Sequence, residues 1–263
     1  MSELILTDRK DDVFEIVLNR PEKRNAMDAG LWEAFSDALR EANRTTGLRA
    51  LVVRGAGKCF SAGIDVTAFM LLPQRYGDDW LKRMRTVTDD FQRVLTYLER
   101  IELPSIALLH GHCLGLGMEL ALACDMRIAA RGTLLGLPES RLGLIPDVGG
   151  TTRLTRLVGP ARAKELIFTG KQIDAEQAER WGIVNRVVEP DGLQKALEAE
   201  LAELRLAAPL AVGMAKRVID GLCDVDRGLM LEGWAQSQLV PTEDFTEGIQ
   251  SFAQKRKPEF KGK

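Results

Sequence analysis

Two glycine-rich turns in the sequence could bind negative charge through backbone groups alone. One spans residues 61–65 (Ser-Ala-Gly-Ile-Asp) and the other spans residues 114–119 (Leu-Gly-Leu-Gly-Met-Glu), and each leads into a helical segment. The first amides of a helix have no acceptor within that helix, and the helix dipole adds positive potential there. Two such amides directed at one oxygen would stabilise an oxyanion without any charged side chain.

Two glutamates are the candidates for acid–base chemistry. Glu119 lies just after the second turn, at the start of an otherwise apolar helical segment. There it is either a first-turn carboxylate favoured by the helix dipole or a functional group directed into a cavity. Glu139 follows Pro138, and taken alone this pattern indicates an ordinary acidic residue at the start of a helix.

Histidine is too scarce for metal or triad chemistry. The chain has two histidines, both in His110-Gly111-His112, so a multi-histidine metal site is excluded. Residues 111–115 have the pattern of a nucleophile elbow with Cys113 as nucleophile, but that architecture needs a later histidine and none follows residue 112. A small buried cysteine is the favoured interpretation. We therefore expect carboxylates and backbone groups to supply the chemistry.

Composition excludes several classes of protein. With 36 Lys and Arg against 38 Asp and Glu, the net charge of −2 provides no basic field for nucleic acid or an anionic membrane. Residues 55–57 start like a dinucleotide-binding fingerprint, but Phe60 occupies its third glycine position. The four cysteines form no C-x-x-C pair, no apolar run is long enough for a bilayer, and the first residues lack a secretion-signal profile. We expect a cytoplasmic protein with reduced thiols.

The elements that position these residues alternate in type over the first half of the chain. Predicted strands at 13–18, 50–54, 105–110 and 125–130 alternate with helices, one capped by Asp28, one at about 80–100 and one at 115–124. This alternation predicts an α/β fold with a largely parallel sheet. Beyond residue 159 we expect one strand, at 184–188, and helices at 160–169, 174–181, 192–207, 209–221, 224–239 and 243–256.

The sequence resembles the crotonase, or enoyl-CoA hydratase/isomerase, superfamily over nearly its whole length. Each matching segment is short, but their order and spacing together are specific. In chain order the segments are Asn19-Arg20-Pro21, Asn25-Ala26-Met27, Phe60-Ser61-Ala62-Gly63-Ile64-Asp65, Gly115-Leu116-Gly117-Met118-Glu119-Leu120-Ala121, Cys124-Asp125, Pro138-Glu139, Gly143-Leu144-Ile145-Pro146, Gly149-Gly150-Thr151, Glu243-Asp244-Phe245, Glu247-Gly248, Phe252 and Lys255-Arg256-Lys257-Pro258.

The resemblance implies a crotonase-like spiral core of ββα units and a helical C-terminal trimerisation region, within one family-level domain. The core with the acyl-CoA site corresponds to residues 1–195, and the helical region that builds a homotrimer or a dimer of trimers corresponds to residues 196–263. The resemblance also implies that the backbone N–H groups of Ile64 and Leu116 hold the oxygen of an acyl-CoA thioester. Coenzyme A is then part of the substrate, and neither a separate cofactor nor a metal is expected.

In hydratases of this family two glutamates flank the bound water, and Glu119 and Glu139 fall at those positions. The implied reaction is syn addition of water to a 2-enoyl-CoA, with Glu119 as base toward the water and Glu139 as proton donor to C2. Two carboxylates in one desolvated site should couple, with one of them protonated near neutral pH. The family pattern also places the substrate along Arg24, Ala26, Ala62, Gly63, Asp65, Gly115, Pro138 and Asp147.

Leu116 and Asp147 depart from the hydratase pattern, in which glycine is frequent at both positions. In dienoyl-CoA isomerases of the family an aspartate at the position of Asp147 is catalytic, but those enzymes usually carry Asp where this chain has Glu119. Asp147 is therefore either a third carboxylate of the site or the cap of a helix that begins near residues 149–151, and capping is the favoured interpretation.

Three functions follow from the resemblance. Hydration of a 2-enoyl-CoA to a 3-hydroxyacyl-CoA comes first, and isomerisation of an enoyl-CoA or dienoyl-CoA double bond comes second. A catalytically silent CoA-binding subunit is third, and the presence of both Glu119 and Glu139 argues against it.

Overall fold

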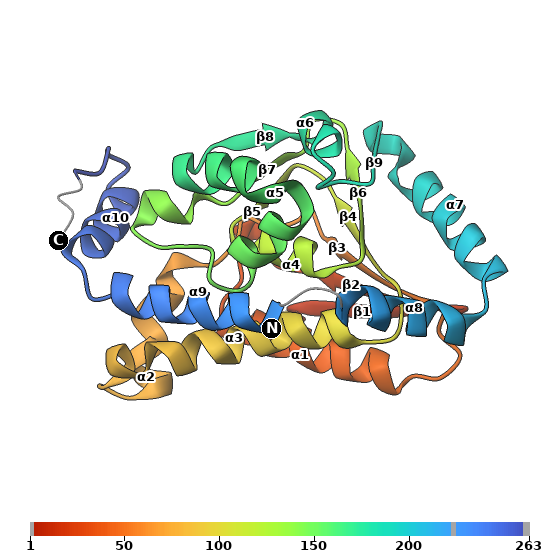
Figure 1. Ribbon diagram of the computed structural model, residues 1–263, viewed down its shortest axis with the longest axis horizontal. Helices are drawn as coiled ribbons and strands as arrows, with labels where there is room; N and C mark the ends of the chain where they lie inside the picture. Colours follow the sequence, from red (N-terminus) through yellow and green to blue (C-terminus); the bar gives the residue numbers. More distant parts are fainter. Residues whose placement is uncertain (1–2, 222–224, 260–263) are drawn as a thin grey trace.

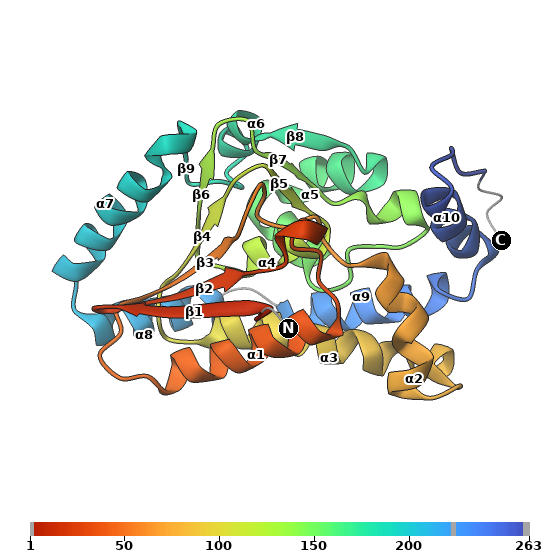
Figure 2. The same cartoon turned by 180° about the vertical axis from the view of Figure 1, so that it is seen from behind.

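The computed structural model describes residues 3–221 and 225–259 and is built around a six-stranded sheet (Figures 1 and 2). β1 and β2 are antiparallel, and every other neighbouring pair in this sheet is parallel. The expected α/β fold with a largely parallel sheet is confirmed. In sheet order the strands are β1 (Ile5–Lys10), β2 (Val13–Leu18), β3 (Ala50–Gly55), β4 (Ser105–Leu109), β6 (Met126–Ala130) and β9 (Arg186–Val188).

A second sheet has three short strands that the sequence pattern did not predict. They are β5 (His112–Leu114), β7 (Leu134–Gly136) and β8 (Gln172–Asp174), in that order across the sheet. Each has three residues, too few for an alternation of apolar and polar residues to stand out. β1 was also missed, because it is an edge strand in which only Ile5 is buried. β5 matters for function, since it leads directly into the second glycine-rich turn.

Helices α1 (Ala29–Arg44) and α3 (Met84–Arg100) lie side by side along one side of the molecule (Figures 1 and 2). Asp28 caps α1 as predicted, because its Oδ1 accepts a 2.9 Å hydrogen bond from Leu31 N. The first turn of the helix predicted from residue 80 is instead a 3₁₀ turn over Trp80–Arg83. Between β3 and this turn the chain forms another 3₁₀ segment (Val66–Leu71) and the short helix α2 (Leu72–Tyr76).

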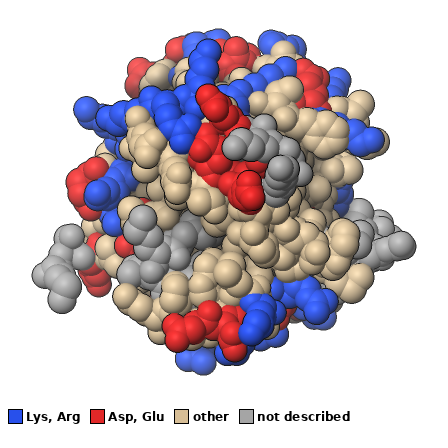
Figure 3. All heavy atoms as spheres, turned by 90° about the vertical axis from the view of Figure 1, so that its left-hand side faces the viewer, with Lys and Arg blue, Asp and Glu red and all other residues tan. Residues whose placement is uncertain are grey.

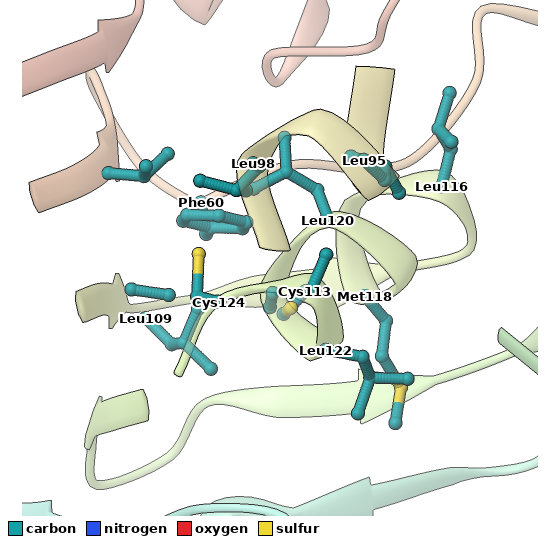
Figure 4. Packing of buried hydrophobic residues seen from close by; sticks show 14 of the residues in the cluster. Phe60, Leu95, Leu98, Leu109, Cys113, Leu116, Met118, Leu120, Leu122 and Cys124 are labelled. Atoms are coloured by element: carbon teal, nitrogen blue, oxygen red, sulfur yellow. The ribbon is translucent and has the colours of Figure 1, made fainter. Parts of the chain in front are cut away.

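Helix α4 (Leu116–Ala123) lies inside the core and is buried on all sides. An apolar helix without a polar face needs such cover, and Phe60, Leu95 and Leu98 belong to the cluster around it (Figure 4). Cys113, just before this helix, is fully buried in the same cluster, and burial raises the pKa of its thiol. Because the thiolate is the nucleophilic form, the interpretation of Cys113 as a structural residue is confirmed.

The C-terminal part is helical, as predicted. Its helices are α5 (Gly150–Thr169), α6 (Ala175–Arg180), α7 (Leu193–Leu206), α8 (Pro209–Gly221), α9 (Val225–Leu239) and α10 (Glu243–Ala253). α5 joins two expected helices, one beginning near residues 149–151 and one at residue 160, across a kink where Gly159 adopts φ 75° and ψ 167°.

Helices α7 and α10 lie at opposite ends of the long axis, and α9 packs along α3 and α5 (Figures 1 and 2). Among the described helices, none is long and apolar enough to cross a membrane.

The end that carries α10 shows side chains of both charges (Figure 3). There Arg256, from the basic C-terminal segment, donates hydrogen bonds of 2.5 and 2.7 Å to the carboxylate of Glu247, so part of that segment's charge is compensated. Lys261 and Lys263 lie outside the described residues, as does Cys223.

Candidate active site

The two glycine-rich turns lie against each other. Ser61 is in parallel register with Cys113, through hydrogen bonds of 3.0 and 3.1 Å that flank the pair. Ile64 follows Ser61 by 64 − 61 = 3 residues, and Leu116 follows Cys113 by 116 − 113 = 3 residues, so the two amides arrive at neighbouring positions. A Cβ placed on Gly63 would lie 3.4 Å from Leu116 N, which shows how close the turns are.

Backbone conformation leaves both amides free. Gly63 has φ +99°, and Gly115 has φ +52° with ψ −129°, conformations that residues with a side chain rarely adopt. Among the residues that the structure describes, neither Ile64 N nor Leu116 N donates a hydrogen bond. Leu116 is also the first residue of α4, so its N–H points out of the helix start, where the dipole favours negative charge.

A buried asparagine holds the first turn in place. Asn25 is fully buried, and its Nδ2 donates to three carbonyl oxygens of the preceding loop at 2.9, 2.9 and 3.1 Å. Ser61 Oγ donates to Asn25 O at 2.8 Å and accepts from Gly63 N at 3.1 Å. The shape of the turn is therefore fixed by side chains that never reach the reacting atoms.

Glu119 is buried, and one of its carboxylate oxygens is already bound. Its side chain projects from the first turn of α4, and Oε1 accepts hydrogen bonds of 2.8 Å from both Val148 N and Gly150 N. Burial raises the pKa of Glu119 well above the usual glutamate value, and the nearby carboxylates of Glu139 and Asp147 raise it further. No hydrogen bond from the described residues reaches the second oxygen, Oε2.

Glu139 belongs to a 3₁₀ turn, Pro138–Leu142, in which the proline starts the turn. Its Oε2 is buried, and among the described residues it has no hydrogen-bond partner. A Cβ on Gly115 would lie 3.2 Å from the other oxygen, Oε1, so glycine makes room for this carboxyl group. Burial, with the charge of Asp147 as a smaller cause, raises the pKa of Glu139 to about 8.

Asp147 is a third carboxylate of the site, and the expected capping role is wrong. The residue before α5 is Gly149, and no hydrogen bond from the helix start reaches Asp147. Asp147 Oδ2 instead accepts a 2.8 Å hydrogen bond from Thr88 Oγ1 of α3. Burial raises the pKa of Asp147 to about 6, although the bond from Thr88 opposes this. Capping failed as an interpretation because other carboxylates occupy the amides of the helix start.

These three carboxyl groups open into one cavity of about 70 Å³. Its wall is otherwise mostly apolar, and it includes both Ile64 and Leu116. The other lining residues are Ala68, Met84, Val87, Thr88, Phe91, Leu144, Ile145, Val148 and Gln236. A concave apolar pocket with a few convergent polar groups is typical of a small-molecule site.

Comparison with known proteins places this chain in a family. The model of the enoyl-CoA hydratase/isomerase family matches residues 8–263. Enoyl-CoA isomerase/hydratase fer4 of Mycosarcoma maydis is 36% identical over 262 residues, covering 95% of this chain and 93% of its own. The human enoyl-CoA hydratase domain-containing protein 2, mitochondrial, is 36% identical over 258 residues, covering 95% and 86%.

Solved structures of enoyl-CoA hydratase and related enzymes are similar to this chain as well. Enoyl-CoA hydratase from Bacillus anthracis superposes with a TM-score of 0.76 at 35% identity, covering 99% of this chain and 100% of its own. A carnitinyl-CoA hydratase from Mycobacterium avium has a TM-score of 0.85 at 32% identity, with both chains fully covered.

The chain belongs to the enoyl-CoA hydratase/isomerase family. It is therefore an enzyme with the crotonase fold, and the superfamily inferred from the sequence is confirmed. The names of these relatives include hydratase and isomerase, which differ in whether water is added or a double bond moves.

The residues that the family pattern assigns to coenzyme A lie beside the first turn. Ala62 N donates to Arg24 O at 2.9 Å, so the two segments are adjacent, and Ala26 is half-buried in the same loop. Asp65, at the end of the turn, accepts a 2.8 Å hydrogen bond from Arg20 Nη1. That ion pair joins the turn to the loop that carries Arg24 and Ala26.

Glu232 of α9 is a residue of this region that the sequence interpretation missed. It is 3% exposed, and burial raises its pKa to about 7. Its Oε2 accepts from Gly149 N at 2.7 Å, and its Oε1 accepts from Thr152 N and Thr152 Oγ1 at 2.6 Å each. The sequence pattern that could have indicated Glu232 is the helical spacing that places it on one face with Leu229 and Gln236. All three residues are buried.

Proposed function

We propose that the protein is an enoyl-CoA hydratase that adds water syn across the double bond of a 2-enoyl-CoA, giving a 3-hydroxyacyl-CoA. The observation that carries this proposal is the pairing of Glu119 with Glu139. Each presents a carboxyl oxygen without a partner among the described residues to the same cavity, beside two free amides. Hydration needs one group to take a proton from water and another to deliver a proton to carbon, and two carboxyl groups suffice.

In this proposal the N–H groups of Ile64 and Leu116 bind the thioester oxygen. When water attacks C3 of the conjugated double bond, negative charge moves through C2 and the carbonyl group to that oxygen. Preorganised amides in a site from which water is largely excluded stabilise such developing charge more than water does. Leucine at position 116 keeps this donor, because the N–H belongs to the backbone.

The two glutamates divide the proton transfers. Glu119 Oε2 removes a proton from the attacking water, while its Oε1 stays bound to Val148 N and Gly150 N. Glu139 delivers its proton to C2. Burial raises the pKa of both glutamates, and because the two carboxyl groups share one site, one of them can be charged while the other keeps its proton. After the product leaves, the proton gained by Glu119 must pass to Glu139, which restores the starting state. The proposed base keeps two accepted hydrogen bonds that favour its charged form, whereas Glu139 Oε2 has none among the described residues.

The coenzyme A part of the substrate would follow Arg24, Ala26 and Ala62 toward the oxyanion turn, with Gly63 and Asp65 beyond them. Gly115 and Pro138 would border the acyl end, because the first makes room for Glu139 and the second starts its turn. Coenzyme A is part of the substrate, so this reaction needs no separate cofactor.

The test of this proposal is an assay with crotonyl-CoA. Wild-type protein should decrease the absorbance of the conjugated thioester and form 3-hydroxybutyryl-CoA, and Glu119→Gln should abolish both changes. The glutamine keeps an oxygen that can accept hydrogen bonds from Val148 N and Gly150 N. The variant therefore removes the base but keeps the two hydrogen bonds that hold the side chain in place. If the wild-type protein binds crotonyl-CoA but neither hydrates it nor moves its double bond, the silent-subunit alternative replaces the proposal.

A double-bond isomerase is the second candidate, and Asp147 is the observation that favours it. Asp147 faces the acyl cavity with a pKa raised to about 6, so it can exchange a proton near neutral pH. An isomerase uses the same oxyanion site but carries a proton between two carbons instead of adding water. Gain of conjugation from a 3-enoyl-CoA, lost on Asp147→Asn while crotonyl-CoA stays unhydrated, would establish this activity.

We also propose that the chain assembles as a homotrimer or a dimer of trimers through its C-terminal helices. Several large apolar side chains of these helices are exposed in the single chain, which is unusual for a surface facing water. They include Leu206, Leu210, Met214, Val218, Met230 and Trp234. Light scattering coupled to size exclusion should give three or six times the chain mass, and a monomer would contradict the proposal.

A further inference from the structure

Helix α9 is joined to the segment 145–152 at three successive points, two of them direct and one through a residue of α3. Gln236 Oε1 accepts from Ile145 N at 3.3 Å, and Glu232 accepts from the start of α5. At the third point Gln92 Nε2 of α3 bridges the two, since it donates to Asp147 O at 2.6 Å and to Leu229 O at 3.0 Å. The segment that carries Asp147 is therefore fixed from the C-terminal helical part of the chain.

The same segment supplies the amides that hold Glu119. The amides around the start of α5 are divided between the carboxylates of Glu119 and Glu232. Val148 N and Gly150 N donate to Glu119 Oε1. Gly149 N and Thr152 N donate to Glu232. Because a helix start has several amides without an intrahelical acceptor, each carboxylate takes the amides that face it.

We propose that Glu232 is a positioning residue of the reaction. By binding Gly149 and Thr152, it holds the start of α5 in the orientation that directs Val148 N and Gly150 N toward Glu119. It acts through Glu119 and does not touch the substrate. This inference rests on the proposed role of Glu119 in hydration.

Loss of Glu232 would free amides next to the catalytic carboxylate. Gly149 N would be buried without an acceptor, which is costly, and Thr152 N, in a half-buried residue, would lose its acceptor as well. Glu119 is a carboxylate at the same helix start, where its Oε1 already accepts from Val148 N and Gly150 N. The helix start would therefore turn toward Glu119 and draw its Oε2 away from the water site.

Three variants of α9 test the inference. Glu232→Ala removes every acceptor, Glu232→Gln keeps one carbonyl oxygen, and Gln238→Ala changes an exposed residue of the same helix as the matched control. We expect Glu232→Ala to lower kcat for crotonyl-CoA by about 10²-fold with little change in KM, because a small displacement of a catalytic group has this effect. Glu232→Gln should restore most of the loss, and Gln238→Ala should match wild type.

A double variant separates positioning from a general loss of structure. If Glu232 acts through Glu119, then Glu232→Ala should cost much less in a Glu119→Asp background than in the wild type, because the shorter side chain is already displaced. Equal losses in both backgrounds would overturn the inference. So would a wild-type kcat in Glu232→Ala, even if its thermal stability fell.

Hydrogen exchange gives a readout that does not depend on activity. In Glu232→Ala the peptide that spans residues 145–152 should exchange at least 10-fold faster, while the peptide of β4 should exchange at the wild-type rate. If the wild-type protein proves inactive on enoyl-CoA, the proposed function fails but this exchange result still decides whether Glu232 orders the segment. Unchanged exchange at 145–152 would overturn the positioning role.

Discussion

The two sides of the active site are built in different ways. The amide side consists of Ile64 and Leu116, whose turns are joined by local strand pairing and held by the buried Asn25. The carboxylate side brings together acidic residues from four separate segments of the chain, namely Glu119, Glu139, Asp147 and Glu232. In the proposed reaction the first side offers charge stabilisation that pH does not change. The second concentrates groups whose pKa values are all raised, so in the proposed hydration the proton transfers and the pH sensitivity belong to it.

The largest effects should come from the carboxylate side. Glu119→Gln and Glu139→Gln should each lower kcat by about 10³–10⁴-fold, because each removes one proton transfer of general acid–base catalysis. Neither variant should unfold more easily than wild type, since glutamine has nearly the same shape and each substitution removes a carboxyl group whose charged form burial disfavours. Steady-state kinetics with crotonyl-CoA and thermal melts measure both quantities, with the exposed Glu33→Gln as control. A loss of less than 10-fold in either variant would contradict the assigned pair.

A substitution that disturbs the amide side should lower the rate of hydration without changing how that rate depends on pH. Gly63→Ala places a Cβ 2.8 Å from Leu114 O and imposes a side chain at φ +99°, so the turn must shift and Ile64 N moves with it. We expect kcat to fall by about 10²–10³-fold, the usual cost of losing one oxyanion donor. The shape of the kcat/KM profile against pH should stay that of wild type. Gly132→Ala is the matched control, because Gly132 also has positive φ (+81°) but nothing lies within 4 Å of its added Cβ.

Asp147→Asn should have a smaller effect on hydration, within about 10-fold, because Asp147 acts on the pair only through its charge. Its removal should lower the pKa of both Glu119 and Glu139, since the charge of Asp147 raises both. The rate profile should therefore move to lower pH on both limbs. A loss of hydration as large as that of Glu139→Gln would instead make Asp147 a direct participant in the reaction.

The smallest expected effect is on stability. The carboxyl groups of Glu139, Asp147 and Glu232 have folded-state pKa values of about 8, about 6 and about 7, all above their ordinary values. Their contribution to stability is complete below the ordinary carboxyl range and is lost as pH rises through these values, because the buried groups must then ionise. We expect Tm to fall by several degrees between pH 6 and 9, since about 1 kcal/mol corresponds to about 2–4 °C in a chain of this size. The Tm of Glu232→Gln should fall less steeply with pH than that of wild type. Identical slopes of Tm against pH would contradict the raised pKa assigned to Glu232.

The contrast between the two sides also explains what the sequence could predict. The amide side depends on glycines and local pairing, so Ile64 and Leu116 could be placed from the turns and the family pattern, and the structure brings them together. Glu119 and Glu139 followed from the family pattern. Asp147 was misjudged because Thr88, its partner, lies on a helix 147 − 88 = 59 residues away. Glu232 was missed because its partners lie 83 and 80 residues earlier, and no local motif records contacts of that range.

Proton exchange at C2 of butyryl-CoA in D₂O tests the division of labour between the glutamates most directly. This saturated thioester cannot add water, so exchange requires only the two amides and the group that moves a proton at C2. We predict that Glu119→Gln, which has lost hydration, still exchanges deuterium at C2 at a rate near that of wild type, whereas Glu139→Gln does not exchange. Exchange that survives in Glu139→Gln and disappears in Glu119→Gln would contradict the account.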